Sequence, residues 1–285
     1  MATDISEKIK DYYPSFSKGQ KKISAAIIRD YDKVAYMTAS KLGRFVGVSE
    51  STVVRFANQL GYEGYSDFQK AIQELVRAKL TPNQRIEITK QRIGHGDILE
   101  NVAVSDIAKI RTTFDNLDKD TFHNACEAIL SSKRIYIMGA RSSEPLAMVL
   151  KYNLSLIFDN VTLVAPKSTA EVFEQMFSIG ENDLLIAFSF PRYSSKMVNA
   201  VRFAEQNHAK VIVFTDSANS PLAKHATYLL TAQSDMASFM DSLVAPISII
   251  NAIIVEITSR REGRIRDRFD RLEKIWDEYH VYTKK

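Results

Sequence analysis

Short runs of β-branched and apolar residues alternate with longer helical stretches in the second half of this chain of 285 residues. The runs are apolar nearly throughout, which is typical of strands that helices cover on both faces. Most of them are separated by about 20 residues, which is enough for a right-handed crossover between parallel strands. The pattern therefore predicts an α/β doubly wound domain with a five-stranded parallel sheet. The expected strands are residues 134–138, 161–165, 183–188, 210–215 and 227–231.

The first eighty residues show helical periodicity without a strand pattern. Residues 80–96 then break the periodicity with Thr, Pro, Asn and Gly, as a linker does. The expected helices of this all-α head are residues 17–31, 32–37, 38–46, 50–60 and 66–79. The expected organisation is a helix-turn-helix head at 1–80, a linker at 81–104, the α/β domain at 105–259 and a charged C-terminal helix at 260–285.

The composition is that of a globular protein, with 45% hydrophobic and 25% charged residues, so each domain can bury a core. Cys126 is the single cysteine, which excludes an intrachain disulfide and a cysteine zinc site. The five histidines lack a metal-binding spacing, and no pattern requires a metal or a cofactor. The polar N-terminus does not resemble a secretory signal, and the longest apolar tract, 243–257, contains Pro246 and Glu256. We therefore expect a cytoplasmic protein without a membrane partner.

Positive charge is concentrated at the two ends of the chain. The net charge is +4 over residues 1–80, −3 over residues 105–258 and +3 from residue 259 onward. A mildly basic head is compatible with a polyanionic partner such as DNA.

Residues 38–56, TASKLGRFVGVSESTVVRF, meet the steric requirements of a helix-turn-helix. Thr38 is placed to cap the first helix, and Ser49 to cap the second. Gly43 is small where the two helices cross, and Gly47 permits a left-handed turn. The alternative is an ordinary three-helix bundle that contains a Gly-Val-Ser turn. The residues expected to be buried are Leu42, Val46, Val48, Val53, Phe56 and Leu60.

The second helix of this motif presents a polar face at its start, as a recognition helix does in the major groove. Its hydroxyl groups can exchange hydrogen bonds with base edges, Val54 can touch a thymine methyl group, and Arg55 can bind a guanine or a phosphate. Lys18, Lys41 and Arg44 are candidates for phosphate contacts. The predicted partner is a double-stranded DNA operator. The predicted DNA-binding residues are Lys18, Lys41, Ser49, Glu50, Ser51, Thr52, Val54 and Arg55.

Two loops that follow predicted strands combine serine and arginine residues. The first, MGARSSEPLA, begins with a tight turn at Gly139, and the second is AFSFPRYSS. Both open helices whose free amides favour an anion, at the edge where parallel α/β sheets bind ligands. The alternative is that the serines are only helix caps. The residues predicted to bind an acidic effector are Gly139, Arg141, Ser142, Ser143, Ser189, Arg192, Tyr193 and Ser194.

Two segments resemble a known family. Residues 17–72, from SKGQKKISAA to SDFQKAI, are similar to the N-terminal domain of RpiR-type transcription regulators. Residues 211–230, VIVFTDSANSPLAKHATYLL, are similar to their C-terminal sugar isomerase (SIS) domain. The resemblance implies a homodimer or homotetramer in which the SIS domain senses a metabolite, commonly a phosphosugar, and thereby changes DNA binding.

The resemblance also implies how the two loops bind phosphate, through the motifs G-x-G-x-S and S-x-S-G-x-[ST]. Arg141 stands here for the second glycine of the first motif. In the second motif, Pro191 stands for the middle serine and Arg192 for the glycine. Proline removes a hydroxyl and an amide donor, whereas the arginines add capacity for bidentate binding of anions. The changes remain compatible with an acidic ligand but weaken the expectation of an ordinary hexose phosphate.

Three functions compete for this sequence. The favoured one is a transcription regulator without enzymatic activity, whose operator affinity is controlled by an acidic metabolite, expected to be a sugar phosphate. The first alternative is a sugar-phosphate isomerase or aminosugar enzyme with an accessory helical domain. The second is a nucleoid or scaffold protein without sequence specificity, which would need neither a capped recognition helix nor a metabolite pocket. Candidate acids and bases for an isomerase are Glu144, Glu171, Glu174, Asp216, His208 and His225.

Overall fold

The computed structural model describes residues 5–79, 81, 83–86, 89, 97–165, 168–235 and 238–283. The chain divides into two compact units, residues 1–84 and residues 85–285. Helix α8 (Ile98–Asn116) begins inside the stretch 81–104 that the sequence suggests as a linker, because Asp97 caps it by accepting from the amides of Leu99 and Glu100. The segments 105–259 and 260–285 belong to the same unit.

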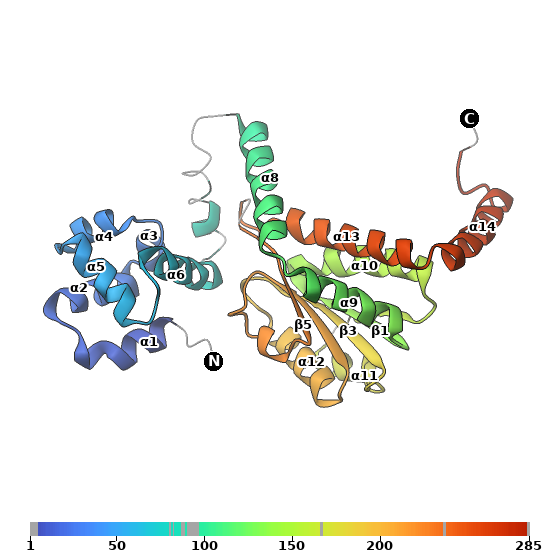
Figure 1. The fold of residues 1–285 in the computed structure, drawn as a ribbon, viewed down its shortest axis with the longest axis horizontal. Coiled ribbons are helices and arrows are strands. Elements are labelled where there is room, and N and C mark those ends of the chain that lie inside the picture. Colours follow the sequence, from blue (N-terminus) through green and yellow to red (C-terminus); the bar gives the residue numbers. More distant parts are fainter. Residues whose placement is uncertain are drawn as a thin grey trace. The chain divides into compact units, whose positions relative to one another are not determined.

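The described part of the first unit is helical, as predicted (Figure 1). Its elements are α1 (Ile5–Tyr12), the 3₁₀ turn η1 (Tyr13–Ser15), α2 (Lys18–Arg29), α3 (Tyr31–Val34), α4 (Ala39–Val46), α5 (Glu50–Gln59) and α6 (Tyr65–Lys79). The sequence pattern misses α1, which buries only a narrow stripe through Ile5 and Ile9. Two apolar residues four positions apart are too weak a periodic signal to predict a helix.

Aromatic rings join the helices of this head. Phe56 on α5 lies between Phe16 and Phe68, with ring centroids 5.0 and 5.6 Å away. The hydroxyl of Tyr65 on α6 donates to the Met37 carbonyl at 2.6 Å, and partial burial raises the pKa of Tyr65 to about 12. The head therefore has its own packed core, which holds α5 between the start of α2 and α6.

The second unit contains the predicted five-stranded parallel sheet, in the order β2-β1-β3-β4-β5. Its strands are β1 (Arg134–Gly139), β2 (Val161–Leu163), β3 (Asp183–Phe188), β4 (Lys210–Thr215) and β5 (Tyr228–Thr231). Its helices after α8 are α9 (Lys119–Ser131), α10 (Glu144–Ile157), α11 (Thr169–Gln175), α12 (Ser195–Gln206), α13 (Val244–Arg260) and α14 (Glu262–Glu278). Short 3₁₀ turns are η2 (Arg141–Ser143) and η3 (Ala223–His225).

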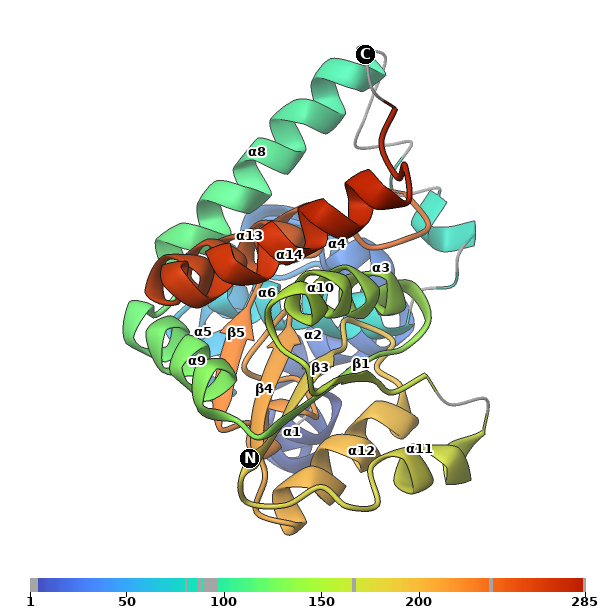
Figure 2. The ribbon, with the colours of Figure 1, turned by 90° about the vertical axis from the view of Figure 1, so that its right-hand side faces the viewer.

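The sheet is the middle of three layers (Figure 2). Helices α9, α10 and α13 cover one face, where Ile137, Ile186 and Phe214 are buried. Helices α11 and α12 cover the other, where Met138 and Val213 are buried. Successive strand residues point to opposite faces, so a strand between two helical layers must be apolar at nearly every position. The burial explains why the sequence signal for the sheet is strong.

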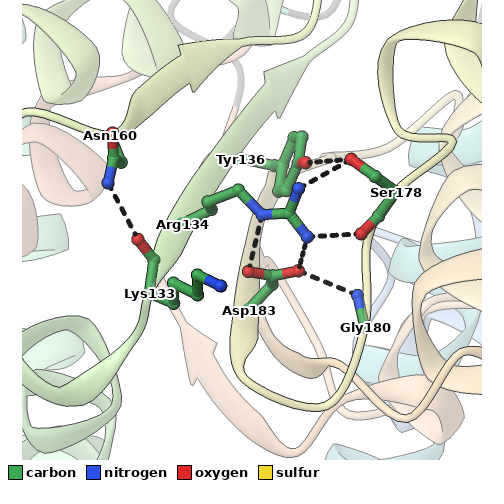
Figure 3. Close-up of polar contacts among 7 residues, drawn as sticks. All are labelled: Lys133, Arg134, Tyr136, Asn160, Ser178, Gly180 and Asp183. Carbon is green, nitrogen blue, oxygen red and sulfur yellow. Dashed lines mark hydrogen bonds and ion pairs between the residues drawn. The ribbon is translucent and has the colours of Figure 1, made fainter.

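An ion pair lies at the amino end of the sheet (Figure 3). Arg134 and Asp183 begin the neighbouring strands β1 and β3, and their side chains meet at 2.6 Å. Arg134 also donates to Ser178, and the Gly180 amide donates to the Asp183 carboxylate at 2.9 Å. Asp183 is buried, and its hydrogen bonds raise the pKa of Arg134 above the usual range. This pair joins β1, β3 and the turn that precedes β3.

The C-terminal helices pack on the α10 side of the sheet domain. Ile249, Ile253 and Ile257 of α13 are buried in its core. Helix α14 covers 262–278 of the helix expected at 260–285, and Arg268 pairs with Asp159 at 2.6 Å. In the described part of the chain, every helix is too short or too polar to cross a membrane.

Cys126 on α9 is fully buried, and burial raises the pKa of its thiol to about 12. We predict that it resists iodoacetamide at about pH 8 in the folded protein, because the thiolate is the reactive form. The chain unfolded in guanidinium should react, since a solvated thiol has a pKa of about 8.5. Because the pKa is higher in the folded state, the resulting stabilisation is fully present below about pH 8.5. It is lost as the pH rises toward about 12. Rapid alkylation of the folded protein, followed by mass spectrometry, would contradict the prediction.

Candidate functional site

Helices α4 and α5 form the predicted helix-turn-helix. Thr38 caps α4 by accepting from the Lys41 amide, and Ser49 caps α5 by accepting from the Thr52 amide. Gly47 ends α4 in the left-handed conformation, with φ 71° and ψ 47°. A Cβ atom on Gly43 would lie 2.8 Å from the Val48 carbonyl oxygen. Both glycines are therefore required by the close approach of the two helices and by the turn between them.

The predicted interior of the motif is confirmed in most positions. Leu42, Val53 and Phe56 are fully buried, and Leu60 nearly so. Val46 and Val48 are only half-buried, because they lie next to the exposed turn at Gly47.

The start of α5 is a cluster of hydroxyl groups. The Ser49 hydroxyl lies 2.9 Å from that of Ser51 and 2.8 Å from that of Thr52. Arg55 is exposed one turn further along, where its Nε donates to the Ser51 carbonyl at 3.3 Å. The exposed amides of this first turn and the hydroxyls favour contact with an anion or with base edges.

The other predicted DNA-binding residues lie on the same head. Glu50 is exposed at the first position of α5, and Val54 is half-buried behind it. Lys18 and Lys41 are exposed in the first turns of α2 and α4. The structure thus leaves the charged members of the predicted set accessible to a partner.

A cavity of about 250 Å³ lies at the carboxyl ends of β1 and β3. The chain leaves β1 toward β2 at one edge of the sheet and leaves β3 toward β4 at the other, so the two loops diverge and open a crevice between them. Six of the eight residues predicted to bind an effector line this cavity. They are Arg141, Ser142, Ser143, Ser189, Arg192 and Ser194.

The other two predicted residues shape the loops. A Cβ atom on Gly139 would lie 2.5 Å from the Ser143 carbonyl oxygen, so only glycine allows the turn after β1. The Tyr193 hydroxyl donates to the Asp216 carboxylate at 2.7 Å, which joins the loop after β3 to the end of β4. These contacts position the residues that face the cavity.

Arg141 and Arg192 both adopt the left-handed backbone conformation, with φ values of 57° and 67°. These are the two positions at which the phosphate-binding motifs have glycine. Such a conformation costs a residue with a Cβ atom about 1–2 kcal/mol relative to its ordinary backbone conformations. Strained backbone conformations cluster at functional sites, and in this chain His208 and His280 also adopt the left-handed region, outside the cavity. Two arginines lining one cavity suit a ligand with anionic groups.

The serines at the starts of α10 and α12 do not act as capping side chains. Ser194 occupies the N-cap position of α12, and Ser143 that of α10. Within the described residues, neither helix receives a hydrogen bond from a capping side chain. The hydroxyls of this cavity are therefore available to a ligand, together with the first amides of α12.

Sequence reasoning missed an ion pair in the wall of the cavity. Arg85 and Asp241 meet at 2.9 Å, and their side chains are 3% and 5% exposed. Phe239 and Met240 line the same wall, and both are exposed. Arg85 lies in the stretch predicted as a linker, 156 positions before Asp241. No local pattern indicates such a distant pairing.

The candidate acids and bases of an isomerase lie elsewhere. His225 pairs with Glu205 at 2.6 Å, and Asp216 accepts from Tyr193. His208 precedes β4, at the opposite end of the strands. Of the described residues that line the cavity, none belongs to the candidate set of Glu144, Glu171, Glu174, Asp216, His208 and His225.

Two family models match the chain. Residues 3–79 match the helix-turn-helix domain of the rpiR family, and residues 128–256 match the SIS domain. The first match contains α4 and α5, and the second contains both loops of the cavity.

Relatives match over both domains. An uncharacterized HTH-type transcriptional regulator of Haemophilus influenzae is 26% identical, over 80% of this chain and 79% of its own length. The HTH-type transcriptional regulator HexR of Escherichia coli is 23% identical, over 95% of this chain and 94% of its own length. The structure of the Vibrio vulnificus NanR protein with ManNAc-6P shares the fold at a TM-score of 0.61 and 20% identity, over 96% and 98%.

We predict that Gly43→Ala destabilises the head by about 1–3 kcal/mol, because the added methyl group meets a backbone carbonyl that must shift. Peptides from α4 and α5 should exchange amide hydrogens faster in this variant. The control is Gly19→Ala in α2, where the nearest atoms lie at an ordinary 3.4 Å. It should be neutral or stabilising by about 0.5–1 kcal/mol. Equal exchange in both variants would be evidence against the close helix crossing.

We predict that Arg192→Gly raises the free energy of unfolding by up to about 1 kcal/mol, and with it the melting temperature. The same substitution should weaken the binding of inorganic phosphate. Glycine relieves the left-handed backbone but removes the guanidinium. The control is His208→Gly, which relieves a φ of 62° remote from the cavity. It should also raise the melting temperature but leave phosphate binding unchanged in calorimetry. If Arg192→Gly binds phosphate as the parent does, Arg192 does not contact the anion.

Proposed function

Because the chain belongs to the RpiR family of helix-turn-helix transcription regulators with a SIS domain, we propose that an acidic metabolite bound in the SIS cavity controls its affinity for a DNA operator. The observation that carries this proposal is the pairing of Arg141 and Arg192, each in a strained backbone conformation, in one serine-lined cavity. Such a site is built to recognise an anion.

DNA binding is supported by the geometry of the head. The turn between α4 and α5 is held by Gly43 and Gly47, so α5 is presented as a rigid element with its hydroxyl cluster and Arg55 exposed. A rigid helix with polar residues at its start can read base edges in the major groove. Lys18 and Lys41 are the proposed phosphate contacts, which supply affinity without sequence preference.

A sugar phosphate is the proposed effector class. The Vibrio vulnificus NanR structure contains a ligand of this class, ManNAc-6P. In the present chain, Ser142, Ser189 and Ser194 offer hydroxyls, and the two arginines offer planar donors that suit a phosphate or a carboxylate. The positive charge of the two guanidinium groups favours an acidic ligand over a neutral sugar.

Regulation is favoured over isomerisation by the composition of the cavity wall. Proton transfer on a bound sugar requires an acid or base within hydrogen-bond reach of the reacting carbon. Among the described lining residues, Asp241 is the one carboxylate and no histidine is present. The cavity is thus better suited to binding than to proton transfer.

We propose that the regulator is a cytoplasmic homodimer or homotetramer, because helix-turn-helix dimers bind two half-sites with two heads. The first half of α8 supports self-association. Its first turns project beyond the other helices of the sheet domain (Figure 1), and Leu99, Val104 and Ile107 are more than half exposed. Exposed apolar surfaces of this kind mark interaction sites. A second copy of α8 offers the same surface in return.

The proposal is tested by two measurements on the whole chain. First, fragments of the source genome retained by the protein should be bound far more tightly than random DNA in gel shifts. Second, some phosphorylated or carboxylated metabolite should raise the melting temperature and change that gel shift.

A ligand at about 100 times its dissociation constant stabilises by about 2.7 kcal/mol. An effector preference of about 1–3 kcal/mol for one state changes operator affinity by roughly 5- to 150-fold. Turnover of an aldose phosphate without selective DNA binding would favour the isomerase instead.

We predict that Arg55→Ala lowers the preference for operator over random DNA by about 1–3 kcal/mol, because a guanidinium that contacts a base edge carries sequence information. The melting temperature and effector binding should stay unchanged, since Arg55 is exposed. The control is Lys41→Ala, which should weaken binding to both DNAs equally and reduce the salt slope by about 1. An unchanged preference in Arg55→Ala would remove Arg55 from the base-reading face.

A further inference from the structure

The Arg85–Asp241 pair lies in the wall of the effector cavity. The two side chains meet at 2.9 Å, and each is at least 95% buried. The cavity that they line also contains Arg141 and Arg192, and its polar lining is otherwise made of serine hydroxyls. Asp241 is therefore a carboxylate held inside a site that attracts anions.

The backbone around Arg85 is attached to the same wall. Thr89, which is buried, donates its hydroxyl to the Arg85 carbonyl at 2.9 Å and contacts the Ser238 carbonyl at 3.4 Å. Residues 83–86 are helical, and Thr81 and Gln84 bond to each other at the start of this turn. Arg85 and Thr89 thus both contact residues 238–241, through two separate side chains.

The charges make this pair replaceable by a ligand. A buried arginine needs an anionic partner, because an unpaired charge in the interior is costly. The partner is supplied here by Asp241, but a phosphate or carboxylate group in the cavity would satisfy the same guanidinium. The anion and Asp241 repel each other, so their simultaneous presence beside Arg85 is disfavoured. An incoming anion and Asp241 therefore compete for Arg85.

We propose that Arg85 is an effector-binding residue, and that Asp241 is an internal competitor which the anionic group of the effector displaces from it. The inference rests on the proposed function, because it assigns the regulation of that same cavity. Arg85 directly follows Gln84, where the chain divides into its two units. A change of partner at Arg85 therefore acts next to the covalent connection between the head and the sheet domain. This is a route by which ligand binding reaches DNA binding through the covalent chain.

The first test measures inorganic phosphate binding to the whole chain by calorimetry at constant ionic strength. Asp241→Asn removes the competing charge and should lower the dissociation constant for phosphate by about tenfold, because the ion pair no longer has to break before the anion binds. Arg85→Gln should weaken binding by at least about tenfold. Asp241→Glu keeps the carboxylate and should stay within about threefold of the parent. The matched control is Asp183→Asn, which breaks the Arg134 pair at the opposite end of the sheet and should not change the affinity.

The second test measures DNA binding without any added anion, on an operator fragment retained from the source genome. Asp241→Asn and Arg85→Gln both break the pair, so both should shift operator affinity in the direction that ligand shifts the parent. The two variants would then shift operator affinity in the same direction. Asp241→Asn would bind phosphate more tightly than the parent, and Arg85→Gln would bind it less tightly. A purely structural pair predicts loss of stability in both variants without tighter phosphate binding in either.

The outcomes separate the two proposals. If the parent binds an acidic ligand but Asp241→Asn binds phosphate no more tightly, the competition is disproved while the effector site stands. If neither the parent nor Asp241→Asn binds any anion, the effector site and the competition both fail. Should Asp241→Asn melt below the working temperature, a larger melting-temperature increase with phosphate than in the parent still supports the competition. An increase equal to or smaller than that of the parent overturns it.

Discussion

The order of strands in the sheet is the constraint on which the cavity depends. Because β1 and β3 are neighbours, and the chain leaves them toward opposite edges, their carboxyl-end loops diverge and open a cavity. The Arg134–Asp183 pair holds the same two strands at their amino ends. Both helical layers can cover the sheet only if the strands are apolar throughout, and this burial keeps the two loops at a fixed separation.

Each of the two loops holds an arginine in a strained, left-handed backbone conformation. Glycine is absent at two left-handed positions, where arginine supplies a guanidinium at the expense of about 1–2 kcal/mol each. Gly139 is kept at the one position where even a methyl group would collide with the Ser143 carbonyl. Tyr193 reinforces the second loop through Asp216. The cavity is thus built from strain that the surrounding packed strands can support.

Much of the fold and part of the site follow from local patterns. The five strands were expected within two residues of their observed ends, because buried strands leave an unmistakable apolar run. Thr38, Gly47 and Ser49 were expected in their observed roles, because caps and left-handed turns need particular residue types. Helix α1 was missed, because its stripe of Ile5 and Ile9 is narrow. The start of α8 was missed, because the turn residues before it suggest a linker.

The sequence by itself determined the class of each domain, the presence of the helix-turn-helix and the two loops that line the cavity. These depend on periodicity, capping and steric limits that act over a few residues. Only the tertiary structure decided that Arg85 pairs with Asp241, 156 positions away, and that Tyr193 bonds to Asp216. A pairing between distant charges depends on burial and on the path of the whole chain, and neither is encoded in local spacing. The strain at Arg141 and Arg192 likewise became visible only as backbone angles.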